Sequence, residues 1–212
     1  MKVKILNEEF EMMSQKALLW KSRKIILLAD MHLGKINHFR KAGIPVPAKA
    51  GYRNWEILID LINATKPERM ICIGDLFHSH YNYDWESFGQ FIKNFTQLSF
   101  ELVSGNHDIL SDHQYNRYNV KVYVDELKLG NFTLSHFPVE EIENGKYAIS
   151  GHLHPGVKLS GRGKQSLTLP CFYFGTRQAY LPAFGMFTGL AHIQPKKEDR
   201  IYVIADGSII KM

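Results

Sequence analysis

The sequence is poor in cysteine and contains no long uninterrupted apolar run. Its only cysteines are Cys72 and Cys171, which excludes a scaffold held by several disulfides and favours a reducing cytoplasm. The longest mostly apolar stretch, residues 179–193, contains Pro182 and two glycines and is too short to span a bilayer. The first dozen residues carry several glutamates, which is not typical of a signal peptide. We therefore expect a cytoplasmic protein with no membrane role.

Charge runs, low-complexity tracts and internal repeats are also absent from the sequence. The chain has 212 residues, of which 45% are hydrophobic and 22% charged, as in an ordinary globular protein. This length predicts a single domain over residues 1–212. The net charge of +5 is compatible with a polyanionic partner but does not require one. The ten histidines are the unusual feature of the composition, so their positions are decisive.

Short apolar runs and two helical periods predict the order of the elements. Runs rich in Ile, Val and Leu predict strands at residues 24–29, 70–73, 99–103, 121–124, 132–135 and 147–150, and further strands at 166–174, 188–193, 200–204 and 208–211. Helices are predicted at 48–65 and 84–98, the second with Asp84 as its N-cap. Alternation of strands and helices up to residue 120 predicts parallel pairing. We expect an α/β (α+β) fold in which two mixed sheets pack together with helices outside.

Polar side chains follow five of the predicted strands. They are Asp30 and His32, Asp75, the run Asn106-His107-Asp108, His136, and the pair His152 and His154. Ligands gather at the carboxyl ends of parallel strands, so we expect these groups to converge. Gly74, Gly105 and Gly151 precede three of the motifs, where a residue without Cβ permits a close approach of the backbone.

Imidazole and carboxylate groups in this number suit two divalent transition metal ions such as Mn, Fe, Zn or Ni. Residues two apart share one side of an extended segment, so each Asp-x-His or His-x-His pair is expected to serve one small site. The two oxygens of Asp75 allow it to bridge both ions, which together would supply hydroxide for attack on phosphorus. His107 is the candidate for stabilising charge or protonating the leaving oxygen, and Asp108 for orienting the ring of His107.

The ordered set of motifs resembles the calcineurin-like metallophosphoesterase superfamily over residues 30–154. The resemblance implies an αββα four-layer sandwich with a dinuclear site and His107 as the catalytic histidine. It assigns Asp30, His32, Asp75 and His154 to one metal ion, and Asp75, Asn106, His136 and His152 to the other.

A narrower resemblance covers more of the chain. The segments LADMHLGK (residues 28–35), FRKAGIPVP (39–47), GDLFHSH (74–80) and LPAFG (181–185) are similar to the bacterial DNA ligase-associated metallophosphoesterases. That family implies a Mn-dependent DNA phosphodiesterase or endonuclease that acts in DNA repair beside an ATP-dependent DNA ligase, a helicase and a nuclease.

The sequence thus predicts a dinuclear phosphodiesterase acting on DNA, with Lys35, Arg40 and Arg177 as candidates for binding phosphates. His78 is a further catalytic candidate, although it is equally suited to capping the turn after its strand. Two alternatives stay open: a phosphoesterase for nucleotides or cyclic nucleotides, and a non-catalytic interaction module on the same fold. The apolar stretch at 179–190 leaves a homodimer open as well.

Overall fold

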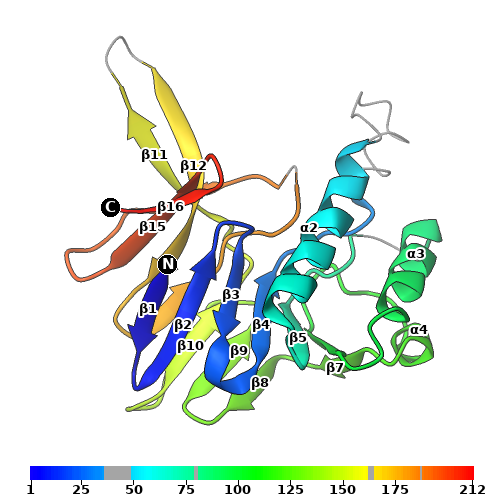
Figure 1. The fold of residues 1–212 in the computed structure, drawn as a ribbon. Helices are drawn as coiled ribbons and strands as arrows, with labels where there is room; N and C mark the ends of the chain where they lie inside the picture. The colour runs from blue at the N-terminus through cyan, green and yellow to red at the C-terminus, as the bar shows by residue number, and fades with distance from the viewer. Residues whose placement is uncertain (36–48, 79–80, 162–164, 187) are drawn as a thin grey trace.

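The computed structural model describes residues 1–35, 49–78, 81–161, 165–186 and 188–212. Its first sheet has seven strands, which lie in chain order from β1 to β7 (Figure 1). The strands are β1 (Lys2–Ile5), β2 (Glu8–Met13), β3 (Ala17–Trp20), β4 (Ile25–Ala29), β5 (Arg69–Ile73), β6 (Ser99–Val103) and β7 (Lys121–Tyr123). The strands from β1 to β4 pair antiparallel, whereas those from β4 to β7 pair parallel. The expected parallel portion of the sheet is therefore confirmed.

The second sheet has nine strands and is also mixed. The strands are β8 (Glu126–Leu129), β9 (Phe132–Ser135), β10 (Tyr147–Ser150), β11 (Pro155–Ser160), β12 (Ser166–Phe174), β13 (Gln178–Tyr180), β14 (Ala191–His192), β15 (Arg200–Ala205) and β16 (Ser208–Lys211). Strand β10 lies between β9 and β13 and is parallel to both, so the carboxyl ends of these three strands meet at one edge. The β11–β12 hairpin extends away from the body of the molecule (Figure 1).

Among the described residues, three α-helices cover one face of the first sheet: α2 (Lys49–Thr65), α3 (Tyr83–Ile92) and α4 (Asp112–Arg117). A 3-10 turn, η1 (Lys21–Arg23), joins β3 to β4. Helix α3 begins earlier than predicted, because the side chain of Asn82 accepts the N–H of Asp84 and so takes the N-cap position expected for Asp84. The helix also ends at Ile92 rather than at residue 98.

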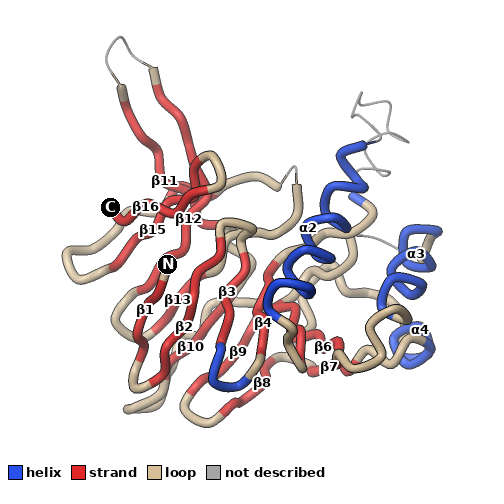
Figure 2. The backbone as a smooth tube through the Cα atoms, viewed as in Figure 1, coloured by secondary structure: helices blue, strands red, loops and turns tan. Residues whose placement is uncertain are grey.

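The protein has two main apolar cores. One lies between the helices and the first sheet. The other lies between the two sheets and joins the inner faces of β1–β6 to those of β9, β10, β12, β13 and β15. The prediction of two packed mixed sheets is confirmed. The helices differ from the four-layer expectation, because all those in the described ranges lie on the first sheet (Figure 2). The outer face of the second sheet instead carries a small apolar cluster around Cys171, Ile201 and Val203. No helix in the described ranges is long and apolar enough to cross a membrane.

Candidate metal centre

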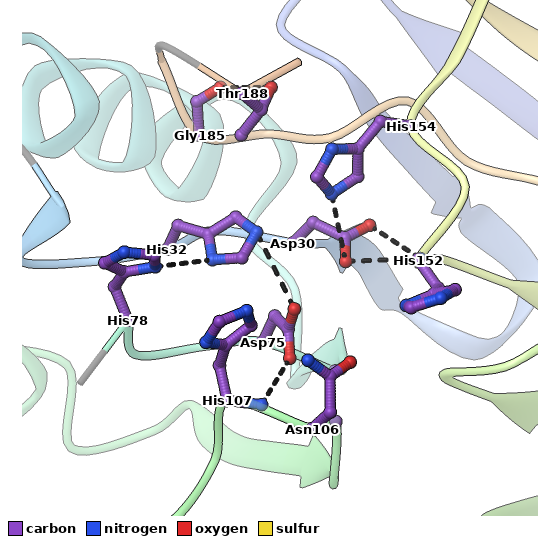
Figure 3. Close-up of polar contacts among 12 residues, drawn as sticks. Asp30, His32, Asp75, His78, Asn106, His107, His152, His154, Gly185 and Thr188 are labelled. Carbon is purple, nitrogen blue, oxygen red and sulfur yellow. Dashed lines mark hydrogen bonds and ion pairs between the residues drawn. The ribbon is translucent and has the colours of Figure 1, made fainter. Parts of the chain in front are cut away.

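The predicted strand ends meet at one edge of the two packed sheets. Figure 3 shows the side chains that follow β4, β5, β6 and β10, and the contacts of His136 bring the end of β9 to the same place. Strands β4, β5 and β6 of the first sheet lead into the loops that carry Asp30, Asp75 and Asn106. Strands β9 and β10 of the second sheet lead into those that carry His136 and His152. The loops after β4 and β5 stay side by side, since the N–H of His32 donates to the carbonyl of Asp75 (2.8 Å). The predicted convergence is therefore present in the structure.

One group of donor atoms comprises Asp30, His32 and His154, whose ligand atoms lie within 4.8 Å of one another. The Nε2 atom of His154 lies 3.5 Å from Oδ1 of Asp30. The Nε2 atom of His32 faces Oδ2 of Asp75 at 3.7 Å. We call Asp30, His32 and His154 the first donor group.

Asn106, His136 and His152 form a second donor group. The Nε2 atom of His136 lies 3.0 Å from Oδ1 of Asn106 and 3.1 Å from Nδ1 of His152. It also lies 3.6 Å from Oδ1 of Asp75. The two oxygens of Asp75 are thus directed at different groups, which is the geometry of a bridging carboxylate.

These distances fit divalent cations between the donor atoms. Two ligand atoms bound tetrahedrally to one ion at about 2.1 Å lie roughly 3.4 Å apart, and the separations within both groups are close to this value. The Nδ1 atom of His136 is buried, finds no hydrogen-bond partner among the described residues and lies 3.7 Å from Asp30. Asp30 and Asp75 are also buried, at 0% and 3% exposure. Two buried carboxylates that face imidazoles only at 3.5–3.7 Å are costly, so the site is suited to receive cations.

Five residues of this site have a left-handed backbone. The φ angles are 51° for Asp30, 45° for His32, 50° for Asp75, 64° for His152 and 46° for His154. Few residues other than glycine adopt such angles, and they concentrate at functional sites where the surrounding structure enforces them. The expectation of extended Asp-x-His and His-x-His segments is therefore wrong. His152 and His154 consequently reach different donor groups rather than one shared site.

Backbone groups fix the orientation of the donor side chains. The N–H of His152 donates to both oxygens of Asp30 (3.2 and 3.0 Å), and the N–H of His107 donates to Oδ1 of Asp75 (3.0 Å). The Nδ1 atom of His154 lies 3.1 Å from the carbonyl of Gly189, which leaves Nε2 toward Asp30. The sequence did not indicate this role of Gly189, because a carbonyl acceptor has no residue signature.

The glycines before the motifs permit the close approach predicted for them. A Cβ on Gly74 would lie 1.8 Å from the ring of His136, and one on Gly105 would lie 2.4 Å from the carboxylate of Asp75. Gly74 also has a φ of +72°, which other residues rarely adopt. Any side chain at these two positions would displace a donor.

Burial keeps the central histidines neutral. It lowers the pKa of His32 to about 2, and the positive charge of Lys35 acts in the same direction. It also lowers the pKa of His136, although the charges of Asp75 and Asp30 oppose this effect. A neutral imidazole retains the lone pair with which it binds a metal ion, so both rings are available as ligands at neutral pH.

The structure gives His107 and Asp108 different surroundings from those expected. The ring of His107 stacks on that of His78, with centroids 5.0 Å apart and planes at 28°. Asp108 is not directed at this ring: its oxygens accept the backbone N–H groups of Gly105 (2.8 Å) and Phe77 (3.3 Å). The orienting role predicted for Asp108 is therefore wrong, because local backbone donors occupy its carboxylate. Burial nevertheless raises the pKa of Asp108 to about 7.

His78 lies beside the first donor group. Its Nδ1 atom is 3.4 Å from Nδ1 of His32, the nitrogen of that ring that faces away from Asp75. The position fits a residue that holds His32 in the orientation needed for binding.

The predicted phosphate-binding residues are dispersed. Lys35 lies near enough to the site for the charges of Asp75 and Asp30 to raise its pKa, against a larger lowering by burial. Arg177 does not reach the site, because its backbone pairs with Ala148 near the start of β10 and its guanidinium donates to the carbonyl of Ile142. Arg40 lies outside the described residues.

Comparisons with known proteins define the class. Residues 23–206 match the calcineurin-like phosphoesterase family, so the chain belongs to this family of metal-dependent phosphoester hydrolases. Among solved structures, the nuclease MPE of Pseudomonas putida is similar, with a TM-score of 0.83 and 25% identity over 100% of this chain and 99% of that chain. Yfce, a phosphoesterase from E. coli, is more distant, with a TM-score of 0.46 and 11% identity over 88% and 96%. No curated protein sequence matches the chain.

Proposed function

We propose that this protein is a dinuclear metal-dependent phosphodiesterase that cleaves DNA. The observation that carries the proposal is Asp75, whose two oxygens face histidines of two separate donor groups. These residues would hold two cations, whose charge would favour a phosphoryl transfer. The similarity to a nuclease over the whole chain supports DNA as the substrate.

The donor set would hold two divalent ions, for which we propose Mn²⁺. Asp30, His32 and His154 would bind one, Asn106, His136 and His152 the other, and Asp75 both. Mixed imidazole, carboxylate and amide donors suit transition metals. When bound, the ions supply positive charge to the phosphate and lower the pKa of a water.

The remaining residues would handle the proton and the orientation of the site. His107 lies beside the first donor group, with its ring centroid 5.4 Å from that of His32. We assign it the donation of a proton to the leaving oxygen. His78 contacts the rings of both His32 and His107 and is assigned the positioning of His32.

The setting in the cell follows the same proposal. An enzyme of DNA repair would act in the cytoplasm beside an ATP-dependent DNA ligase, a helicase and a nuclease. A homodimer is compatible with this proposal. Sedimentation with and without DNA measures the oligomeric state.

The decisive experiment measures hydrolysis of single- and double-stranded DNA, cyclic nucleotides and a chromogenic phosphodiester with Mn²⁺. Controls contain a chelator or the His107→Gln protein. We expect DNA cleavage that requires both the metal and His107. Turnover of cyclic nucleotides with intact DNA would replace the substrate class, and metal binding without turnover of any ester would favour an interaction module.

A further inference from the structure

Phe137 is exposed, whereas most aromatic side chains of this protein are buried. It is 47% exposed and is the one phenylalanine in the described ranges with this degree of exposure. It follows His136 directly, so it lies at the rim of the second donor group. A ligand that covered this ring would gain the free energy of burying its exposed apolar area.

The ring of Phe137 packs on the histidines of the site. Its centroid lies 4.7 Å from those of both His136 and His152, with interplanar angles of 75° and 59°. Neither imidazole is parallel to the phenyl ring, so neither takes the place of a stacked ligand. His152 is itself exposed, and the two rings therefore form one accessible surface beside the donor atoms.

The backbone of Phe137 is held in place. Its carbonyl accepts the hydroxyl of Ser150 (3.1 Å), the buried last residue of β10. Pro138 follows it, which restricts Phe137 to extended conformations. The ring is thus presented in a restricted orientation and would lose little entropy when a ligand binds.

We propose that Phe137 binds a nucleobase of the substrate by stacking, next to the phosphate that is cleaved. The inference rests on the proposed function, since the adjacent donor atoms are those that would bind the phosphate. The ring of His152, a donor of the second group, is in contact with that of Phe137, so a base stacked on Phe137 would belong to a nucleotide beside the bound phosphate. Every base has a π-face, so this contact recognises nucleotides without selecting a sequence.

The kinetic test compares two esters with the same leaving group: thymidine 5′-(p-nitrophenyl phosphate) and methyl p-nitrophenyl phosphate. Phe137→Leu keeps apolar contact with His152 but lacks an aromatic face, whereas Phe137→Tyr keeps the face. We expect Phe137→Leu to lower kcat/KM about tenfold for the thymidine ester alone. Phe137→Tyr should keep the wild-type kcat/KM for both esters. The control is Ile210→Ala, which alters an exposed apolar side chain elsewhere, on β16, and should change kcat/KM for neither ester.

A purely structural role would give a different pattern. If Phe137 only supported His152, Phe137→Leu would affect both esters equally or neither, and this result would overturn the inference. A wild-type protein that hydrolyses neither ester would instead contradict the proposed function.

A binding measurement distinguishes failure of this inference from failure of the proposed function. The His107→Gln protein with Mn²⁺ keeps the donor atoms but cleaves slowly, and fluorescence anisotropy at low salt compares its binding of labelled oligothymidylate and of an abasic oligomer of equal length and charge. We expect it to bind the thymidylate about tenfold more tightly, and the His107→Gln/Phe137→Leu protein to lose this preference. Equal affinities in the His107→Gln protein, or a preference that survives when Phe137→Leu is added, would overturn the inference whatever the catalytic result.

Discussion

The two ends of strands β5 and β6 both carry buried charge but treat it in opposite ways. Near their amino ends, the carboxylate of Glu101 accepts hydrogen bonds from Arg69 (2.6 and 2.7 Å), Tyr123 (3.0 Å) and Ser99 (3.2 Å). Beyond their carboxyl ends, Asp75 faces histidine nitrogens at 3.6 and 3.7 Å. Glu101 is therefore closed by short bonds to side chains, and we call this the closed end. Asp75 accepts one short bond, from the backbone N–H of His107, and its imidazole neighbours are farther away, where a ligand fits; we call this the open end.

The largest expected effect concerns the open end. Asp75→Asn preserves an acceptor for the N–H of His107 but removes the charge directed at both donor groups. We expect hydrolysis to fall by about 10³-fold or more and bound Mn²⁺ to decrease. Activity assays and metal analysis by mass spectrometry measure this. The melting temperature in chelator should not fall, because one of two buried carboxylates has been neutralised. Two ions per chain at the wild-type rate would refute the bridging role.

The closed end should give the converse result. Arg69→Met leaves Glu101 buried without its principal partner, and the free energy of unfolding should fall by about 2–3 kcal/mol, since Arg69 is partly exposed. Urea denaturation measures this loss. The matched control is Lys2→Met, which breaks an exposed ion pair with Glu9 and should leave the midpoint unchanged. Loss of metal binding in folded Arg69→Met protein would show that the two ends are not independent.

A substitution of His107 tests whether metal binding and catalysis at the open end depend on different residues. His107→Gln should lower kcat by about 10²–10³-fold, because the proton donor is lost. Metal content should not change, as the backbone N–H that holds Asp75 remains. A parallel loss of Mn²⁺ would assign His107 to the metal ligands instead.

His78 should have a smaller effect on the same end. His78→Asn removes the ring beside His32, and we expect the affinity for Mn²⁺ to fall about 10–100-fold, with a wild-type kcat at saturating metal. Titration with Mn²⁺ followed by activity separates these parameters. A reduced kcat at saturation would mean that His78 takes part in the reaction itself.

The smallest effect is the pH dependence of the closed end. Burial raises the pKa of Glu101, but the hydrogen bonds of Arg69 and Tyr123 outweigh it, so the pKa lies below its usual value of 4.5. Its stabilising contribution is therefore complete above about pH 4.5 and is lost as the pH falls through the folded-state pKa. The stability difference between the wild-type protein and Glu101→Gln should shrink in this range in urea melts. A constant difference from pH 7 to pH 3 would contradict the shift.

Most donor residues of the site could be predicted from the sequence, because apolar runs reveal where the strands end. Apolar runs located β4, β5, β6, β9 and β10, and a donor lies within three residues of the end of each run. Strands β1 and β2 were not predicted, since charged residues alternate with buried ones in both, as glutamates do with Phe10 and Met12 of β2. This alternation is typical of a strand with one solvated face, and a search for apolar runs does not find it.

Backbone conformation accounts for the failures at the site. The left-handed angles at Asp30 and His152 arise from tertiary contacts, such as the hydrogen bonds between the His152 N–H and the Asp30 carboxylate. The same limit applies to Asp108, whose side chain is captured by the Gly105 N–H. Residue type predicts which side chains gather at this edge of the sheets. It does not predict how the local backbone orients them.

The bond between Asp30 and His152 spans 122 positions of sequence, and the contact of His154 with Gly189 adds a segment still later in the chain. The donor set therefore assembles only when distant parts of the polypeptide have come together, and such non-local contacts require loop closure before they form. A growing or partly folded chain lacks the complete set. Under the proposed function, the capacity to cut DNA would arise only in a finished molecule, so folding itself would act as the safeguard against premature cleavage.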